Sequence, residues 1–328
     1  MREVLAAVGR AREWDMRSQR LAANMTTGLA PMADEWQRKR KKARARLMAA
    51  FSLPETAFEI VVIKTTGDRI LDRPLKEIGG KGLFTREIED ALFAGAIDLA
   101  VHSMKDMPTR QPMGLTMGGY LPREDVRDAF VSPGCAGLAD LPAGAVVGSS
   151  SLRRRAQLAH RRPDLKLVEF RGNVQTRLKK LEDGVAVATF LAMAGLNRLG
   201  MAHVARSAIA PEEMLPAVAQ GAIGIERRTD DARAAELLAA IHDPATGERL
   251  AAERAYLETL DGSCQTPIAG LAIHDGGGLW LRGEILRPDG SDAIRGERRC
   301  TTTDAAEAGN DLARELLGLA PKGFFDWR

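Results

Sequence analysis

The chain has 328 residues, of which 45% are hydrophobic and 28% charged, and this balance is that of a soluble globular protein with two or three domains. Aromatic residues make up only 5% and the net charge is +3, which argues against a stacking surface for single-stranded nucleic acid and against a nucleic-acid binder in general. No apolar run approaches the roughly 20 residues of a membrane span, and three scattered cysteines suit a reducing cytoplasm better than a disulfide framework.

Residues 1–45 are polar and basic and show no clear period. The basic run from Arg38 to Arg46 is explained most simply by a solvated helix face or a frayed arm, with nucleic acid or an anionic surface as the alternative. No apolar segment leads to a small-residue cleavage site near the N-terminus. We therefore expect no secretory signal and a cytoplasmic location.

The pattern sharpens from residue 58. Residues 58–68 are typical of a buried strand, 78–84 of a glycine-rich loop and 97–104 of a second apolar strand. Between the loop and the second strand, residues 85–96 predict a helix with Thr85 as its N-cap. A strand, a loop, a helix and a strand in this order indicate a parallel sheet covered by helices.

A second series of alternating elements begins near Asp128. Strands are predicted at 145–150, 164–170 and 185–192, and helices at 151–162, at 174–184 and from 194. The apolar segment 221–228 predicts one more strand, which we expect to cross back into the first lobe. The result is two α/β lobes joined by the chain crossing between them.

The last part of the chain has a different pattern. Helices are predicted at 231–241, 248–260 and 304–318. Between the second and third of these helices, segments 270–275, 279–287 and 293–302 predict an antiparallel meander with Gly-rich and Pro-Asp-Gly turns. A small α+β domain therefore follows the two lobes.

Several cationic and hydroxyl side chains follow predicted strands, where functional groups of parallel sheets gather. They are Ser149, Ser150 and Ser151 before a helix that carries Arg153 and Arg154, then Arg171, Arg177 and Arg198, with Lys81 in the glycine-rich loop. Any one of these arginines alone is better explained as a surface charge. Their recurrence at strand ends predicts a ligand with many negative charges, and bidentate guanidinium geometry suits carboxylates and phosphates equally.

The segment "AVHSMKDMP" places Asp106 at another strand end. This carboxylate could stabilise a cationic intermediate or move a proton, or it could be an ordinary turn residue that pairs with Lys105. His102 has no partner at metal-ligand spacing, so we interpret it as a structural histidine and expect no metal site. "GGKGLF" lacks the spacing of a phosphate-binding Walker loop.

The segment "LETLDGSCQTPIAG" holds Cys264 in a Gly-Ser turn between a predicted helix and a predicted strand. Taken alone, a cysteine in a small turn is more simply explained as inert than as functional.

Eight segments occur in an order that resembles the porphobilinogen deaminase (hydroxymethylbilane synthase) family, and the resemblance runs from about Phe58 to the C-terminus. They are "IGGKGLF", "DLAVHSMKDMP", "REDVRDAF", "VVGSSSLRRRAQL", "FRGNVQTRL", "AGLNRLG", "LPAVAQGAIGIE" and "LDGSCQTPIAG". The resemblance implies two lobes similar to periplasmic binding proteins, with mainly parallel sheets, plus a small α+β C-terminal domain that anchors a cofactor. Lobe one would comprise 1–121 and 222–239, with 1–45 atypical, lobe two 127–215 and the third domain 244–328.

The resemblance also implies a transferase of tetrapyrrole biosynthesis that condenses four porphobilinogen units and releases ammonia. It would use a covalent dipyrromethane cofactor, held by a thioether to Cys264, with Asp106 as the catalytic residue. Cofactor-binding residues would be Ser103, Lys105, Ser149, Ser151, Arg153, Arg154, Arg171 and Arg177, and substrate-binding residues Lys81, Phe84, Arg198 and Gln220. The enzyme would act as a cytoplasmic monomer that contacts neither nucleic acid nor membrane.

One segment departs from the family pattern. Members begin with a strand and loop close to Gly-Thr-Arg-Gly-Ser-Pro-Leu-Ala, whereas Thr26–Ala33 here is "TTGLAPMA" and lacks that arginine and serine. Two alternatives to an active deaminase therefore stay open. One is a two-lobed anion-binding protein without catalysis, and the other is a family member impaired by its altered N-terminal segment.

Overall fold

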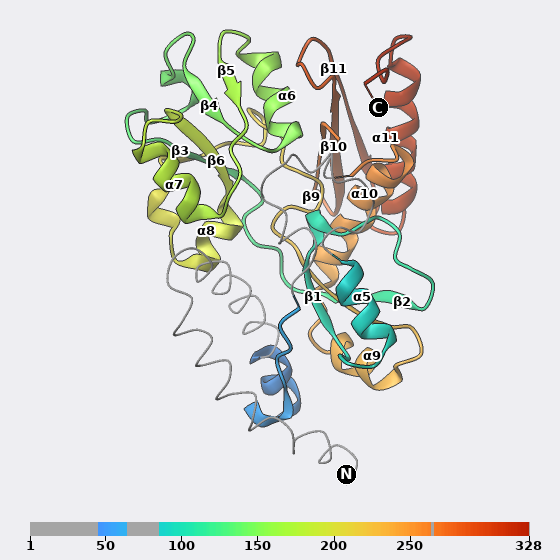
Figure 1. Ribbon diagram of the computed structural model, residues 1–328. Helices are drawn as coiled ribbons and strands as arrows, with labels where there is room; N and C mark the ends of the chain where they lie inside the picture. Colours follow the sequence, from blue (N-terminus) through green and yellow to red (C-terminus); the bar gives the residue numbers. More distant parts are fainter. Residues whose placement is uncertain (1–44, 64–84, 264–265, 328) are drawn as a thin grey trace.

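The computed structural model describes residues 45–63, 85–263 and 266–327. Within these ranges the longer strands form three sheets, and helices pack against them (Figure 1). This mixture of sheets and helices confirms the predicted α/β class. Short 3-10 helices occur at Glu55–Ala57, Met104–Asp106, Leu138–Asp140 and Ala202–Val204.

The first sheet has the order β1-β8-β2. Its strands are β1 (Ala100–Ser103), β2 (Leu115–Tyr120) and β8 (Ile223–Arg228), and helices α5 (Arg86–Phe93) and α9 (Ala232–Ala239) contact it. The position of β8 between β1 and β2 confirms that this segment returns to the first lobe. Mainly parallel sheets are expected from the sequence, but both pairings in this sheet are antiparallel. The reason is that β8, which returns from the second lobe, runs in the direction opposite to both β1 and β2.

Residues 58–63, predicted as the start of a buried strand, form no strand in the structure. Ile60, Val61 and Val62 are 40%, 42% and 69% exposed. An apolar run becomes a strand only where a neighbouring backbone satisfies its hydrogen bonds, and no described strand pairs with this one. The strand prediction is therefore wrong for 58–63. The remainder of that segment and the loop 78–84 lie outside the described residues.

The second sheet has the order β5-β4-β6-β3-β7. Its strands are β3 (Asp128–Val131), β4 (Val146–Gly148), β5 (Lys166–Val168), β6 (Ala188–Ala192) and β7 (Ser207–Ala208). β4 is parallel to β5 and to β6, as predicted, whereas β3 is antiparallel to β6 and β7. The parallel part brings the carboxyl ends of β4, β5 and β6 to one edge.

Helices α6 (Leu152–Arg161), α7 (Val174–Glu182) and α8 (Met193–Leu199) follow these three strands, as predicted. The side chains of Ser151 and Asn173 cap α6 and α7 by accepting backbone N–H bonds. The N-termini of α6 and α7 therefore lie at the carboxyl ends of adjacent strands.

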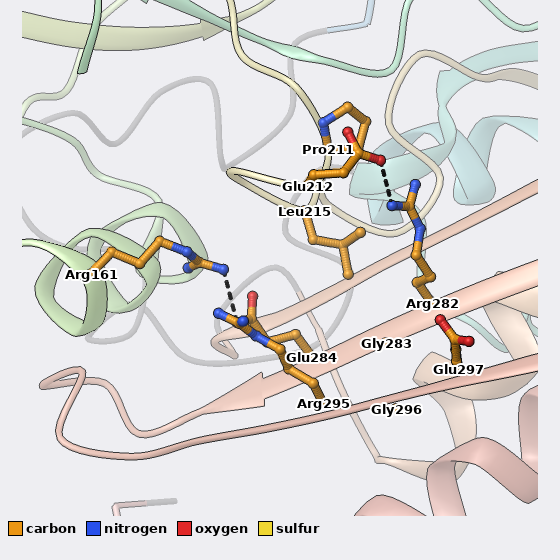
Figure 2. Close-up of a pocket in the computed structure, with 10 residues that line it drawn as sticks. All are labelled: Arg161, Pro211, Glu212, Leu215, Arg282, Gly283, Glu284, Arg295, Gly296 and Glu297. Atoms are coloured by element: carbon orange, nitrogen blue, oxygen red, sulfur yellow. Dashed lines mark hydrogen bonds and ion pairs between the residues drawn. The ribbon is translucent and has the colours of Figure 1, made fainter. Parts of the chain in front are cut away.

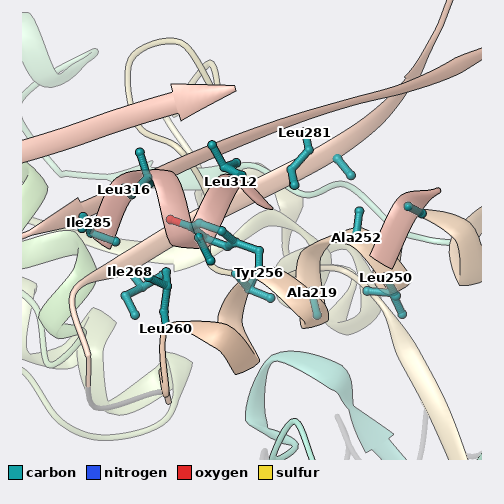
Figure 3. Close-up of a cluster of buried hydrophobic side chains, with 14 of the residues drawn as sticks. Ala219, Leu250, Ala252, Tyr256, Leu260, Ile268, Leu281, Ile285, Leu312 and Leu316 are labelled. Atoms are coloured by element: carbon teal, nitrogen blue, oxygen red, sulfur yellow. The ribbon is translucent and has the colours of Figure 1, made fainter. Parts of the chain in front are cut away.

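The third sheet is the predicted antiparallel meander, with the order β11-β10-β9. It comprises β9 (Ile268–Asp275), β10 (Gly278–Leu286) and β11 (Ala293–Cys300), covered by α10 (Pro244–Thr259) and α11 (Ala305–Leu319). Tyr256 of α10 lies at the centre of their shared core, among Leu281, Ile285, Leu312 and Leu316 (Figure 3). The helix that precedes the cysteine turn is thus fixed along one face of this sheet.

Two chain crossings connect the first and second sheets: the first (121–127) leads from β2 to β3, and the second (209–222) leads from β7 to β8. The two crossings touch each other. The backbone N–H of Glu124 in one donates to the carbonyl of Gly221 in the other at 3.2 Å. Gly221 has φ +85°, and a Cβ there would lie 2.5 Å from the Glu124 carbonyl oxygen. Only glycine allows the two crossings to approach this closely.

Glu253 of α10 joins both crossings to the third domain. Its carboxylate, which is fully buried, accepts hydrogen bonds from the Arg123 guanidinium at 2.6 and 3.0 Å. It also accepts the backbone N–H groups of Ala219 (2.7 Å) and Ala272 (2.8 Å). One buried carboxylate therefore links the first crossing, the second crossing and β9.

Candidate active site

The start of α6 has the predicted hydroxyl groups. Ser149 Oγ accepts the backbone N–H of Ser151 at 3.2 Å, and Ser151 Oγ accepts that of Arg154 at 3.4 Å. Ser150 Oγ accepts the N–H of Phe170 from the segment after β5. These oxygens hold the turn together as acceptors, which leaves their O–H groups to donate to an anion at the helix N-terminus.

Arg153 and Arg154 meet a carboxylate that the sequence did not single out. Asp128, the first residue of β3, is 0% exposed. Its Oδ2 lies 2.7 Å from Arg153 Nη2 and its Oδ1 lies 2.6 Å from Arg154 Nη2. Burial alone would raise the pKa of Asp128, but the two guanidinium groups outweigh burial and hold this pKa well below its usual range.

One edge of each guanidinium still has no partner within the described residues. The Nε–H groups of Arg153 and Arg154 are buried and make no hydrogen bond there. Two arginines and one aspartate also leave one positive charge uncompensated at this place. A ligand carboxylate would supply both the missing acceptor and the missing negative charge.

Arg177 lies in the first turns of α7, and its Nε donates to the carbonyl of Gly172 at 2.9 Å. Within the described residues it forms no ion pair. Burial first, and then the positive charges of Arg154 and Arg171, lower the pKa of Arg177 to about 10, against an opposing effect of Glu169. Arg177 therefore lies close enough to two other predicted arginines, Arg154 and Arg171, to be repelled by both.

Arg198 and Gln220 lie beside the second crossing. Arg198 Nη2 donates to the carbonyl of Gly221 at 2.8 Å. Gln220 is 1% exposed, and its amide nitrogen donates to the Val126 carbonyl at 2.7 Å and to Asp128 Oδ1 at 2.9 Å. Both predicted substrate-binding residues thus also bond to the backbone of the two crossings, Arg198 to the second and Gln220 to the first.

Ser103, Lys105 and Asp106 lie at the end of β1 and in the 3-10 helix that follows it, Met104–Asp106. Ser103 is buried, Lys105 is half-buried and Asp106 is exposed. The neighbouring His102 is buried against Glu226, with 3.1 Å between Nε2 and Oε2. This pairing fits the structural interpretation of His102, and no group of three or more potential metal ligands occurs among the described residues.

Cys264, Lys81 and Phe84 lie outside the described residues. The flanks of Cys264 are described, however: Thr266 Oγ1 accepts the Ser263 N–H at 2.9 Å and donates to the Ser263 carbonyl at 2.7 Å. Two hydrogen bonds therefore join the residues on either side of Cys264 and Gln265, between the end of α10 and the start of β9. The other two cysteines, Cys135 and Cys300, are partly buried and lie elsewhere in the fold.

A hollow of about 250 Å³ lies elsewhere, between the end of α6 and the face of β10 and β11 (Figure 2). Figure 2 shows Arg161 directed toward Glu284, and Arg282 facing Glu212. Glu284 accepts from Arg161 at 3.1 Å and from Arg295 at 2.6 Å, and Glu212 accepts from Arg282 at 2.7 Å. Because each cation has a carboxylate partner, this hollow lacks the excess positive charge found at the start of α6.

These features define the class: an α/β protein that gathers arginine and serine side chains at the strand ends of one sheet, with an exposed aspartate in the neighbouring lobe. The family model described as "Porphobilinogen deaminase, dipyromethane cofactor binding domain" matches residues 35–236, and that described as "Porphobilinogen deaminase, C-terminal domain" matches 248–318. The first match begins before Phe58, where the resemblance by motif begins.

A porphobilinogen deaminase of Paracoccus denitrificans is 74% identical over 286 residues, which cover 87% of this chain and 91% of that protein. The chloroplastic porphobilinogen deaminase of Pisum sativum is 52% identical over 291 residues, covering 87% and 79%. The chain therefore belongs to the porphobilinogen deaminase family and is a transferase of tetrapyrrole biosynthesis.

Among solved structures, a periplasmic substrate-binding protein of an ABC transporter from Coxiella burnetii matches with a TM-score of 0.40 and 14% identity, over 65% of this chain and 90% of that one. In the part of the chain that is described, no helix combines the length and apolar character needed to cross a membrane.

Proposed function

We propose that this chain condenses four porphobilinogen units into hydroxymethylbilane, and that the arginines around the start of α6 bind the carboxylates of the growing chain. Each porphobilinogen unit carries an acetate and a propionate, so the product is a polyanion. The observation that carries the proposal is the pair of buried Nε–H groups on Arg153 and Arg154, which have no partner in the described part of the chain and lie beside the cationic Arg177.

The same residues suit a dipyrromethane group. Its carboxylates would be held by residues of the second lobe, namely Ser149, Ser151, Arg153, Arg154, Arg171 and Arg177, and by Ser103 and Lys105 of the first lobe. Bound through a thioether to Cys264, the group supplies the terminal pyrrole carbon to which the next unit is added. The hydrogen bonds between Ser263 and Thr266 support this role, because these two residues flank the proposed attachment position after α10.

Asp106 is proposed as the catalytic residue. Its carboxylate is exposed, so it can approach a substrate without breaking a buried ion pair. An ionised carboxylate stabilises positive charge as it develops on a pyrrole nitrogen, and it can take up or deliver the proton that the condensation and the loss of ammonia require. Lys81, Phe84, Arg198 and Gln220 would line the substrate path.

The proposal includes a division into lobe one (1–121 and 222–239), lobe two (127–215) and a third domain (244–328). The three separate sheets support this division, since each falls within one of these units. The proposal also has the protein act as a cytoplasmic monomer without nucleic acid or membrane partners. The low net charge supports the absence of a nucleic-acid partner, and the three scattered cysteines support a reducing cytoplasm.

Intact mass of the protein purified after expression with ample porphobilinogen tests the proposal. The wild type should be heavier than the sequence mass by two substrate units and should turn pink with Ehrlich's reagent. Cys264→Ser should abolish both signals and the turnover, whereas the matched controls Cys135→Ser and Cys300→Ser should retain them. An unmodified wild-type mass without turnover would favour a non-catalytic anion-binding protein, and an adduct without turnover would favour an impaired deaminase.

A further inference from the structure

Asp128 belongs to the segment "REDVRDAF", whose contribution to the site is otherwise unexplained. Its two carboxylate oxygens serve three donors: Arg153 on Oδ2, and Arg154 and Gln220 on Oδ1. The two arginines are consecutive residues of α6, so their side chains leave the helix in directions about 100° apart. A single carboxylate between them therefore sets the position of both guanidinium groups.

Backbone carbonyls complete this arrangement. Arg153 Nη1 donates to the Leu215 carbonyl at 2.8 Å, and Arg154 Nη1 donates to the Phe190 carbonyl at 2.9 Å. With the Nη atoms held in this way, each guanidinium plane is fixed, and its Nε edge is the part left over for another acceptor.

The position of Asp128 is itself secured from two sides. Asp128 pairs with Ala192 of β6 at the end of the ladder between β3 and β6. Gln220, in the second crossing, donates to Asp128 Oδ1, and its own backbone carbonyl accepts Arg123 Nε at 2.9 Å. The Asp128 carboxylate is thus held in place both by the pairing of β3 with β6 and by Gln220.

We propose that Asp128 is a positioning residue for ligand binding: it aims the Nε edges of Arg153 and Arg154 at a ligand carboxylate and reduces the repulsion between the two guanidinium groups. This inference rests on the proposed role of those arginines in binding carboxylates. Asp128 makes no contact with the reacting atoms, and it acts through the arginines alone.

The test is Asp128→Asn, measured with porphobilinogen on the full-length protein. Asparagine keeps the shape but offers one oxygen, and its NH₂ group faces a guanidinium that also donates. We expect the KM for porphobilinogen to rise at least about 10-fold, the usual scale for losing one hydrogen bond to a charged group. The kcat per chain that carries the covalent adduct, counted by intact mass, should stay within about threefold. Asp128→Glu keeps the charge, so its KM should lie between those of the wild type and Asp128→Asn.

Glu253→Gln is the matched control, because Glu253 is also fully buried and paired with an arginine, Arg123, but touches neither Arg153 nor Arg154. It should lower the melting temperature while its KM stays within about twofold of the wild type. An unchanged KM in Asp128→Asn, or an equal rise in Glu253→Gln, would overturn the positioning role. If Asp128→Asn does not fold, Asp128→Glu decides in the same way. Wild-type turnover and mass, measured alongside, report on the proposed function separately.

Discussion

Asp128 and Asp106 lie in two neighbouring regions of the molecule and have opposite surroundings. Asp128 is fully buried at the start of β3 and is bound by three side-chain donors. Asp106 is exposed at the end of the 3-10 helix after β1. A buried, fully paired carboxylate can fix the geometry of its neighbours but cannot reach a substrate, whereas an exposed one can reach a substrate. The proposed roles would therefore divide positioning and chemistry between two aspartates.

The largest effect should come from Asp106. Asp106→Ala should lower kcat by about 100-fold to 10,000-fold, the range that a positioned acid–base or electrostatic group contributes. Because the side chain is exposed, the melting temperature and the covalent adduct should be retained. Steady-state kinetics, thermal unfolding and intact mass measure the three quantities. Asp230→Ala, another exposed aspartate, is the control, and normal turnover in Asp106→Ala would show that the division of roles is wrong.

Substitutions of two arginines of the second lobe should have different effects on the stability of the protein. Arg153→Met removes a buried ion-pair partner and should lower the free energy of unfolding by about 3 kcal/mol. Arg177→Met should leave that free energy unchanged or higher, because burial and neighbouring cations already disfavour the charged form of Arg177. Urea unfolding at pH 7 compares the two variants. Equal losses in both would mean that Arg177 has a stabilising partner like that of Arg153.

The smallest effect is a change in the pH dependence of stability. The folded chain holds the pKa of Asp128 well below the usual value near 3.9. The contribution of the Asp128 carboxylate to the free energy of unfolding is therefore complete above about pH 4 and is lost as the pH falls further. Asp128→Asn should therefore lose up to about 1.4 kcal/mol per pH unit of the acid-side slope that the wild type shows below pH 4. Chemical denaturation at pH 5, 4 and 3 measures this slope. Identical slopes in both proteins would place the acid sensitivity elsewhere.

Sequence patterns located the helices that begin after β4 and β5 and the residues on them, because strand, turn and helix signals are local. Asp128 escaped notice for the opposite reason. Its role depends on the place of β3 beside β6 and on Gln220, which lies 92 residues later in the chain. Residues 58–63 show the converse limit: their apolar character predicted a strand, but a strand also needs a partner, and the composition of a segment does not specify one.

Glu253 has a mechanical consequence. Four hydrogen bonds tie this one carboxylate to both crossings and to β9, so any rotation of one lobe against the other that preserves them must turn about this point. Displacement in such a rotation grows with distance from the axis. Groups beside Glu253 hardly move, whereas the loops farthest from it sweep the widest arcs. A rotation of this kind would move the outer parts of the lobes while the middle of α10, which carries Glu253, stays nearly still.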